Sequence, residues 1–170
     1  KPLFFLAQFV LLGTLTISFF SLLFMESKWS GAWWFAGGLT WLLAATAYIF
    51  SNLFWEMAVF PYFAVGALIP VLWISFNGFG DLSSALQVFL AWLWGTVFVA
   101  AHVAFSDFIR AEKWKKFDLP FLFGSGLVFV GALSLASART FEIDRITPLF
   151  FVSLGIAITY AAFHIYRPQI

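Results

Sequence analysis

Six long apolar stretches fill almost the whole of this 170-residue chain, and they restrict its fold more than any other feature. An α-helix needs about 20 mostly apolar residues to cross the hydrocarbon core of a bilayer. The stretches that meet this length are residues 2–24, 31–51, 57–77, 82–105, 119–137 and 146–166. Because 63% of the residues are hydrophobic and only 10% are charged, a water-soluble domain could not cover so much apolar surface. The sequence therefore predicts an integral membrane protein.

The same stretches predict a single all-α domain over residues 1–170, a six-helix transmembrane bundle with short loops. In lipid, backbone N–H and C=O groups must be paired within the segment, which favours helices over open strands. A transmembrane barrel needs alternating polar and apolar residues, and the runs at 19–24 and 88–94 do not alternate. The first stretch is too long for the apolar region of a signal peptide, so we expect a retained helix.

Loop charges predict the orientation of this bundle. Six helices place both termini on one side, together with the second and fourth loops. The cations of that side are Lys1, Arg110, Lys113, Lys115, Lys116 and Arg167. Those of the opposite side are Lys28, Arg139 and Arg145. Since positive residues gather on the cytoplasmic side, both termini are expected in the cytoplasm of a bacterial-type cytoplasmic membrane, with residues 106–118 as a solvated loop near anionic headgroups.

Aromatic and polar residues inside the stretches are the candidate solute-contacting groups. Rigid rings can narrow a pore, while hydroxyl and amide groups can line one. The residues expected at the constriction are Phe35, Trp41, Tyr62 and Trp92. The residues expected to form the polar lining are Thr46, Asn52 and Thr96. The alternative roles are helix packing, lipid contact and, for the hydroxyls, bonds to their own backbone.

Glu56 is the candidate coupling group of a proton-driven carrier. It begins the third stretch, and no Lys or Arg lies close to it in the sequence. Carboxylates at membrane depth are costly and tend to face cavities or to move protons. The alternative interpretation is a carboxylate exposed at the cytoplasmic interface.

His102 and His164 lie at matching depths, near the ends of the fourth and sixth stretches. Two imidazoles from separate helices can ligate a haem iron, so both are possible haem ligands. Ordinary hydrogen bonding at the interface is the alternative role. No further cofactor or metal site is expected, because the chain has no Cys and no carboxylate cluster.

Two function classes are not supported by the sequence. The net charge is +1, so there is no basic surface for nucleic acid. The chain also lacks the nucleophile-elbow, zinc-protease and phosphate-loop motifs, and we therefore expect no catalytic residues and no enzyme.

Three short motifs carry a family resemblance. Residues 35–38 are Phe-Ala-Gly-Gly, residues 52–54 are Asn-Leu-Phe, and residues 89–98 are Phe-Leu-Ala-Trp-Leu-Trp-Gly-Thr-Val-Phe. All three are similar to motifs of the acetate–succinate transporter (YaaH-type) family. The third also resembles the Trp-Leu-Ala-Trp run of the AmiS/UreI amide and urea channel family. The chain departs from the acetate family where Asn-Pro-x-Pro-Leu-Gly-Leu should precede the first helix, since residues 1–3 are Lys-Pro-Leu.

The resemblance implies a six-helix protomer in a homo-oligomer, a hexameric ring with one pore in each protomer. Our first hypothesis is therefore a membrane channel or proton-coupled transporter for a small solute, such as the monocarboxylate acetate. A weak acid in its protonated form loses most of its desolvation penalty. The second hypothesis is a non-enzymatic membrane subunit of a larger complex, with haem or pigment held through His102 and His164.

Overall fold

The chain is helical throughout the part that the structure describes. This structure is a computed structural model, and it describes residues 10–11, 13, 15–17, 31–78, 83–109, 111–140 and 146–166. Its main helices are α2 (Gly31–Trp55), α3 (Val59–Gly78), α4 (Ser84–Val103), α6 (Asp118–Thr140) and α7 (Ile146–Tyr166). Between α4 and α6 lie the π-helical turn η2 (Ala104–Phe108) and the short helix α5 (Glu112–Lys115). The all-α expectation is confirmed for these residues, whereas the helix expected at 2–24 lies mostly outside them.

Helix ends differ from the expected ones where apolar residues continue past a polar one. The sequence predicts the second helix to stop at Ser51, but α2 continues to Trp55 because residues 53–55 are again apolar. The fourth helix passes its expected end at residue 105 by changing to π-helical geometry through Phe108. The last helix has the expected bounds.

Three helical segments of the described chain are long and apolar enough to cross a membrane, namely Trp34–Trp55, Ala85–Ser106 and Glu112–Ser137. Two further apolar helical segments, Val59–Val71 and Phe151–Ala162, lie within α3 and α7. These helices agree with the expectation of an integral membrane protein.

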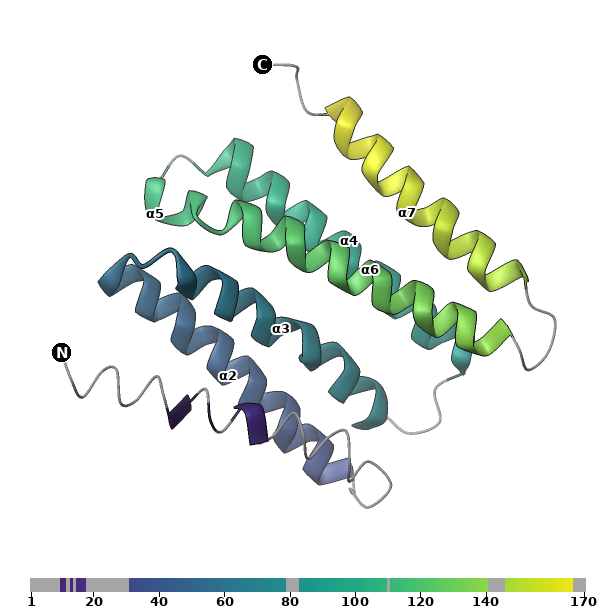
Figure 1. Ribbon diagram of the computed structural model, residues 1–170, viewed down its shortest axis with the longest axis horizontal. Helices are drawn as coiled ribbons and strands as arrows, with labels where there is room; N and C mark the ends of the chain where they lie inside the picture. Colours follow the sequence, from purple (N-terminus) through teal and green to yellow (C-terminus); the bar gives the residue numbers. More distant parts are fainter. Residues whose placement is uncertain are drawn as a thin grey trace.

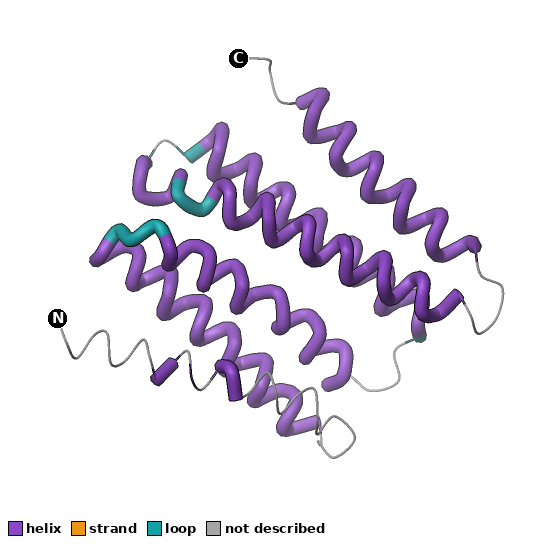
Figure 2. The backbone as a smooth tube through the Cα atoms, in the orientation of Figure 1, coloured by secondary structure: helices purple, strands orange, loops and turns teal. Residues whose placement is uncertain are grey.

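The helices form two groups that meet along one line of contact. Helices α2 and α3 form an antiparallel hairpin, helices α4 and α6 form a second one, and α7 packs against both α4 and α6 (Figure 1). Contact between the groups runs mainly through α3 and α6. The α2–α3 turn and the α5 segment lie at the same end of the bundle, which we call the α5 end (Figure 2).

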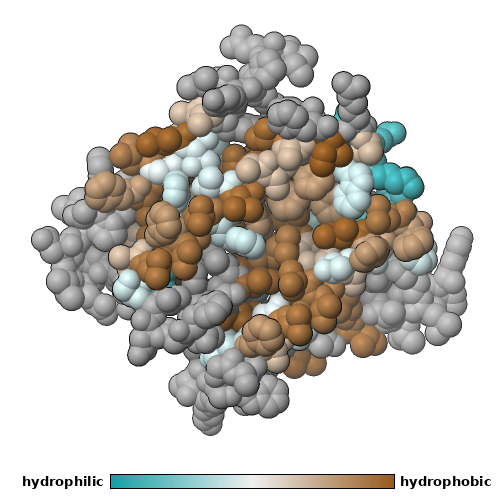
Figure 3. Space-filling model, turned by 180° about the vertical axis from the view of Figure 1, so that it is seen from behind, coloured by the Kyte–Doolittle hydropathy of each residue, from teal (hydrophilic) through white to brown (hydrophobic). Residues whose placement is uncertain are grey.

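Many large apolar side chains face outward, while several alanines are buried between the helices. On α2, Phe35 is 75% exposed, whereas Ala44 and Ala45 are nearly inaccessible. The same holds on α6, where Ala132 and Ala136 are fully buried and Phe123 is exposed. Apolar residues cover much of the face seen in Figure 3. Such an arrangement suits a lipid surrounding, in which close backbone approach rather than hydrophobic burial holds helices together.

Gly124 marks the closest meeting of the two groups. A Cβ atom at this position of α6 would lie 2.7 Å from Cγ1 of Val65 on α3 and 2.9 Å from the ring of Phe98 on α4. Only a residue without a side chain allows the three helices to approach this closely.

Candidate solute cavity and the polar network beside it

A cavity of about 250 Å³ lies along the α2–α3 hairpin and is closed on another side by part of the segment 15–17. Aromatic residues that carry an N–H or O–H group contribute much of its wall. The lining residues are Leu15, Thr16, Trp41, Tyr48, Tyr62, Phe63, Gly66 and Ala67. None of them is charged.

Helical spacing brings the aromatic residues of this cavity together. Trp41 and Tyr48 are seven residues apart on the buried face of α2, and they are only 7% and 2% exposed. Tyr62, Phe63 and Gly66 follow one another within about one turn of α3. The rings of Tyr48 and Phe63 are in contact, with centroids 5.3 Å apart. The structure therefore places two of the expected constriction residues, Trp41 and Tyr62, at one site.

The indole of Trp41 supplies an unused donor at this cavity. Its Nε1 is buried, and no acceptor for it is present in the described part of the chain. A buried N–H group without a partner is unfavourable, so such groups are normally paired with protein, water or ligand. A carbonyl or hydroxyl oxygen of a solute would satisfy it.

The remaining residues of the expected constriction and lining lie elsewhere. Phe35 faces outward and contributes to neither described cavity. The hydroxyls of Thr46 and Thr96 donate to the carbonyl oxygens of Leu42 and Trp92 within their own helices, at 2.9 and 3.0 Å. Hydroxyls of this kind are partly used by the backbone, which is the alternative role considered for them.

Trp92 lines a separate and larger cavity, of about 440 Å³, between α4 and α7. Its walls are apolar apart from the indole of Trp92, and they are formed by Ala85, Val88, Phe89, Trp92, Phe151, Val152 and Gly155. The indole Nε1 of Trp92 is buried against Gly155. We prefer the smaller cavity as the solute site, because a polar solute needs more than one polar group to replace its hydration.

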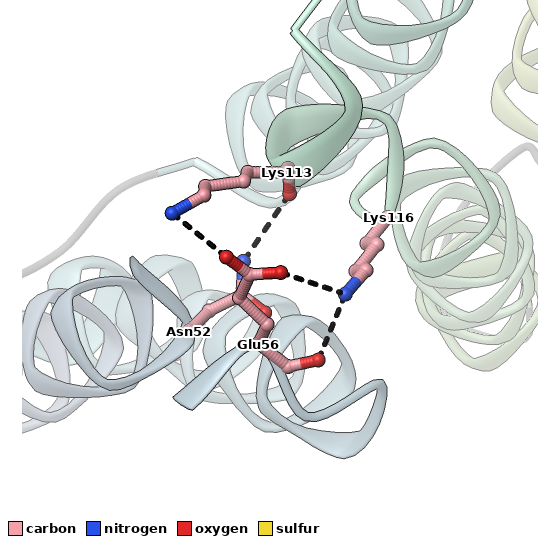
Figure 4. A network of polar contacts seen from close by, with 4 residues as sticks. All are labelled: Asn52, Glu56, Lys113 and Lys116. Atoms are coloured by element: carbon pink, nitrogen blue, oxygen red, sulfur yellow. Dashed lines mark hydrogen bonds and ion pairs between the residues drawn. The ribbon is translucent and has the colours of Figure 1, made fainter. Parts of the chain in front are cut away.

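A polar network at the α5 end joins the two helix groups (Figure 4). Lys113 Nζ lies 2.7 Å from Oε1 of Glu56, and Lys116 Nζ donates to the backbone oxygen of Glu56 at 2.8 Å. Lys116 Nζ is also 4.0 Å from Oε2 of the same carboxylate. Asn52 Nδ2 donates to the backbone oxygen of Lys113 at 3.3 Å, across 61 residues of sequence.

Glu56 occupies a backbone conformation that normally belongs to glycine. Its φ is +49°, and its N–H donates to the oxygen of Asn52 at 2.9 Å, which ends α2 in a left-handed cap. The hydrogen bond and charge of Lys113 hold the pKa of the Glu56 carboxyl below its ordinary value. Desolvation opposes this lowering, and the charge of Lys116 adds to it. The carboxylate is half exposed and lies at the surface of the α5 end, beside two lysines that are remote in sequence.

Asn52 is the buried member of this network. It is fully inaccessible, and no described residue donates a hydrogen bond to its Oδ1. It lies one turn beyond Tyr48 on the same buried face of α2. The cavity and the network therefore follow one another along a single helix face.

His102 is buried beside α6 and is oriented by Asp118. Its Nδ1 lies 3.0 Å from the backbone oxygen of Asp118 and also contacts the carboxylate of that residue. The side chain of His164 lies outside the described part of the structure. No group of three or more His, Cys, Asp or Glu side chains that could hold a metal is present among the described residues.

Sequence reasoning did not single out Phe63 and Gly66 as cavity residues, nor Lys113 and Lys116 as partners of Glu56. The seven-residue spacing of Trp41 and Tyr48 was a usable signal, since it places both on one helix face. Nothing local to Glu56 indicates the lysines. Comparison of the chain with family models, curated proteins and solved structures found no match.

Proposed function

We propose that this chain is a membrane channel or carrier that passes a small uncharged solute through the cavity between α2 and α3. The observation that carries this proposal is the joint lining by Trp41, Tyr48 and Tyr62 on helices of the predicted membrane domain. Their hydroxyl and indole groups can replace part of the hydration of a solute. Their rings limit its size.

The lining also favours a particular protonation state of the solute. None of the described residues that line the cavity is Lys, Arg, His, Asp or Glu, so a bare carboxylate would lose its hydration without gaining a counter-charge from them. A monocarboxylate such as acetate would therefore pass together with its proton, and a neutral amide such as urea would need none. The loop charges add the expectation of cytoplasmic termini in a bacterial-type cytoplasmic membrane. The family resemblance adds that of a six-helix protomer in a homo-oligomeric, hexameric ring.

Gly66 offers a direct test, because it lines the cavity and a Cβ placed on it meets no atom within 4 Å. We expect Gly66→Leu to fill the cavity and to lower the uptake of labelled urea and acetate into proteoliposomes at least tenfold. Gly131→Leu is the matched control, since Gly131 is equally open but lies on the surface of α6. The proposal is contradicted if the unsubstituted protein takes up solute no faster than protein-free liposomes do. It is also contradicted if the two variants take up solute equally fast.

A further inference from the structure

We infer that residues 111–117, here called the strap, form an ionically latched gate over the α5 end of the solute path. The existence of a solute path rests on the proposed function, whereas the contacts that hold the strap do not depend on transport. It assigns Glu56 to the latch rather than to proton coupling.

The strap is held very differently on its two sides. Toward α4 and α6 it is anchored by aromatic contacts. The rings of Trp114 and Phe105 are stacked with their centroids 6.3 Å apart, and Phe117 is buried. Toward α2 and α3 it is held by the carboxylate and backbone oxygen of Glu56 and by the amide of Asn52. Apolar packing makes the first side a stable attachment, while the polar contacts on the second side can exchange with water.

The ionic contacts are suited to opening. The side chains of Lys113, Glu56 and Lys116 are 52%, 47% and 33% exposed. Ion pairs this exposed are weak and are screened by salt, so thermal motion can break them. A latch must favour the closed state only slightly, so that the strap can still open, and an exposed ion pair contributes a suitably small free energy.

The backbone at Glu56 points to a role for its side chain. A left-handed cap position strongly favours glycine, which has no Cβ to clash with the neighbouring carbonyl. Glu56 occupies this position with φ +49° and uses its carboxylate on the strap. Strain of this kind persists where another interaction compensates for it.

A buried side-chain amide, with an oxygen that can still accept a hydrogen bond, lies beneath the strap. Asn52 contacts the strap through Nδ2, is completely buried, and has an Oδ1 that accepts no hydrogen bond from any described residue. Because Asn52 follows Tyr48 by one helical turn, a solute leaving the cavity toward the α5 end would reach this amide next. Opening the strap would connect the amide to water.

The test measures how fast a membrane-impermeant maleimide labels a reporter thiol under the strap. The 170-residue chain contains no Cys, so Asn52→Cys supplies a unique thiol. Ser51→Cys, only 6% exposed and nearly isosteric, is a second reporter that leaves Asn52 intact. In liposome-reconstituted protein we expect Glu56→Gln or Lys113→Met to speed labelling about two- to fivefold, as loss of an exposed ion pair allows. The charge swap Glu56→Lys with Lys113→Glu should restore slow labelling, and Lys115→Met, an exposed lysine of the strap outside the network, should leave it slow.

Urea and acetate flux is measured on the same variants without the reporter thiol. Faster labelling together with faster flux supports the gate. Equal labelling in all variants overturns it, and so does faster labelling with unchanged flux, because the strap would then be only a clamp. Absence of flux in every variant refutes the proposed function instead. In that case, faster labelling in the variants that break the latch still supports a strap that opens. Equal labelling rates in all variants still rule out such a strap.

Discussion

At the scale of single residues, Asn52 and Glu56 depart from what folding alone would select. A fully buried amide with an unused acceptor and a glutamate in a left-handed cap both oppose stability. Both lie at the α5 end, within one turn of each other. Their neighbourhood is the most informative place for substitutions.

Asn52→Leu separates a structural role from a functional one. The change removes an unsatisfied oxygen and one long hydrogen bond of 3.3 Å, and leucine has a similar shape. We expect the free energy of unfolding to change by less than about 1 kcal/mol, because the change removes a buried acceptor that receives no hydrogen bond from a described residue, and the oxygen left behind belongs to the exposed residue Lys113 and can accept from water. Solute flux should nevertheless fall. Denaturation in detergent and uptake assays measure the two quantities, and a large loss of stability would assign Asn52 to structure alone.

The latch should depend on pH in one direction only. Lys113 and Lys116 face Glu56 from the strap and lower its pKa, so the folded protein holds the ionised carboxylate more tightly than the unfolded chain does. Pairing is therefore complete above the ordinary pKa of 4.5 and is lost as the pH falls through the lowered value.

Spin labels placed through Met57→Cys and Lys115→Cys report this transition as a distance distribution between the α2–α3 turn and the strap. We expect no change between about pH 7 and pH 5 and longer distances below the ordinary pKa. Glu56→Gln should give the long distances at every pH. A transition centred near neutral pH would mean that another group controls the strap.

At the scale of helices, the bundle depends on the close contact of α3, α4 and α6 around Gly124. Composition alone indicates helices rich in small residues, but it does not tell which glycine lies at a contact. Gly124 has Val65 and Phe98 against it, while Gly126, two residues later on the same helix, has no atom within 4 Å of a Cβ.

Gly124→Ala and Gly126→Ala therefore form a matched pair. The first forces a methyl group into a contact of 2.7 Å and should destabilise the protein by about 1–3 kcal/mol, as overpacking does. The second should stabilise it slightly, by up to about 1 kcal/mol, because alanine is the better helix former. Reversible unfolding in detergent measures both. Equal effects would show that α3 and α6 do not meet at Gly124.

At the scale of the whole molecule, two helix groups share a narrow contact and are bridged at the α5 end by charges. This construction permits the groups to shift relative to one another while each keeps its own packing. It also places His102 against Asp118 between α4 and α6, where the imidazole already has a structural role.

The absorption spectrum of the purified protein distinguishes the two hypotheses for the whole molecule. A solute channel or carrier needs no haem, so the proposed function predicts no Soret band. A Soret band that disappears in His102→Ala but survives in Trp41→Phe would instead support the haem-binding subunit.

Hydropathy and composition are enough to predict that the chain is helical and apolar enough for a membrane. That inference needs only one segment at a time, since a long apolar run must satisfy its own backbone in lipid. For the same reason the described helices begin and end close to their expected bounds.

Which of the candidate residues lie at one site depends on how the helices pack, and this is seen only in the folded structure. It placed Trp41 and Tyr62 at one cavity, Trp92 at another and Phe35 on the outer surface. It also paired Glu56 with lysines about 60 residues away, although the sequence near Glu56 shows no cation. Contacts between helices depend on the rotation and depth of both partners, and neither is encoded in the local pattern of a single helix.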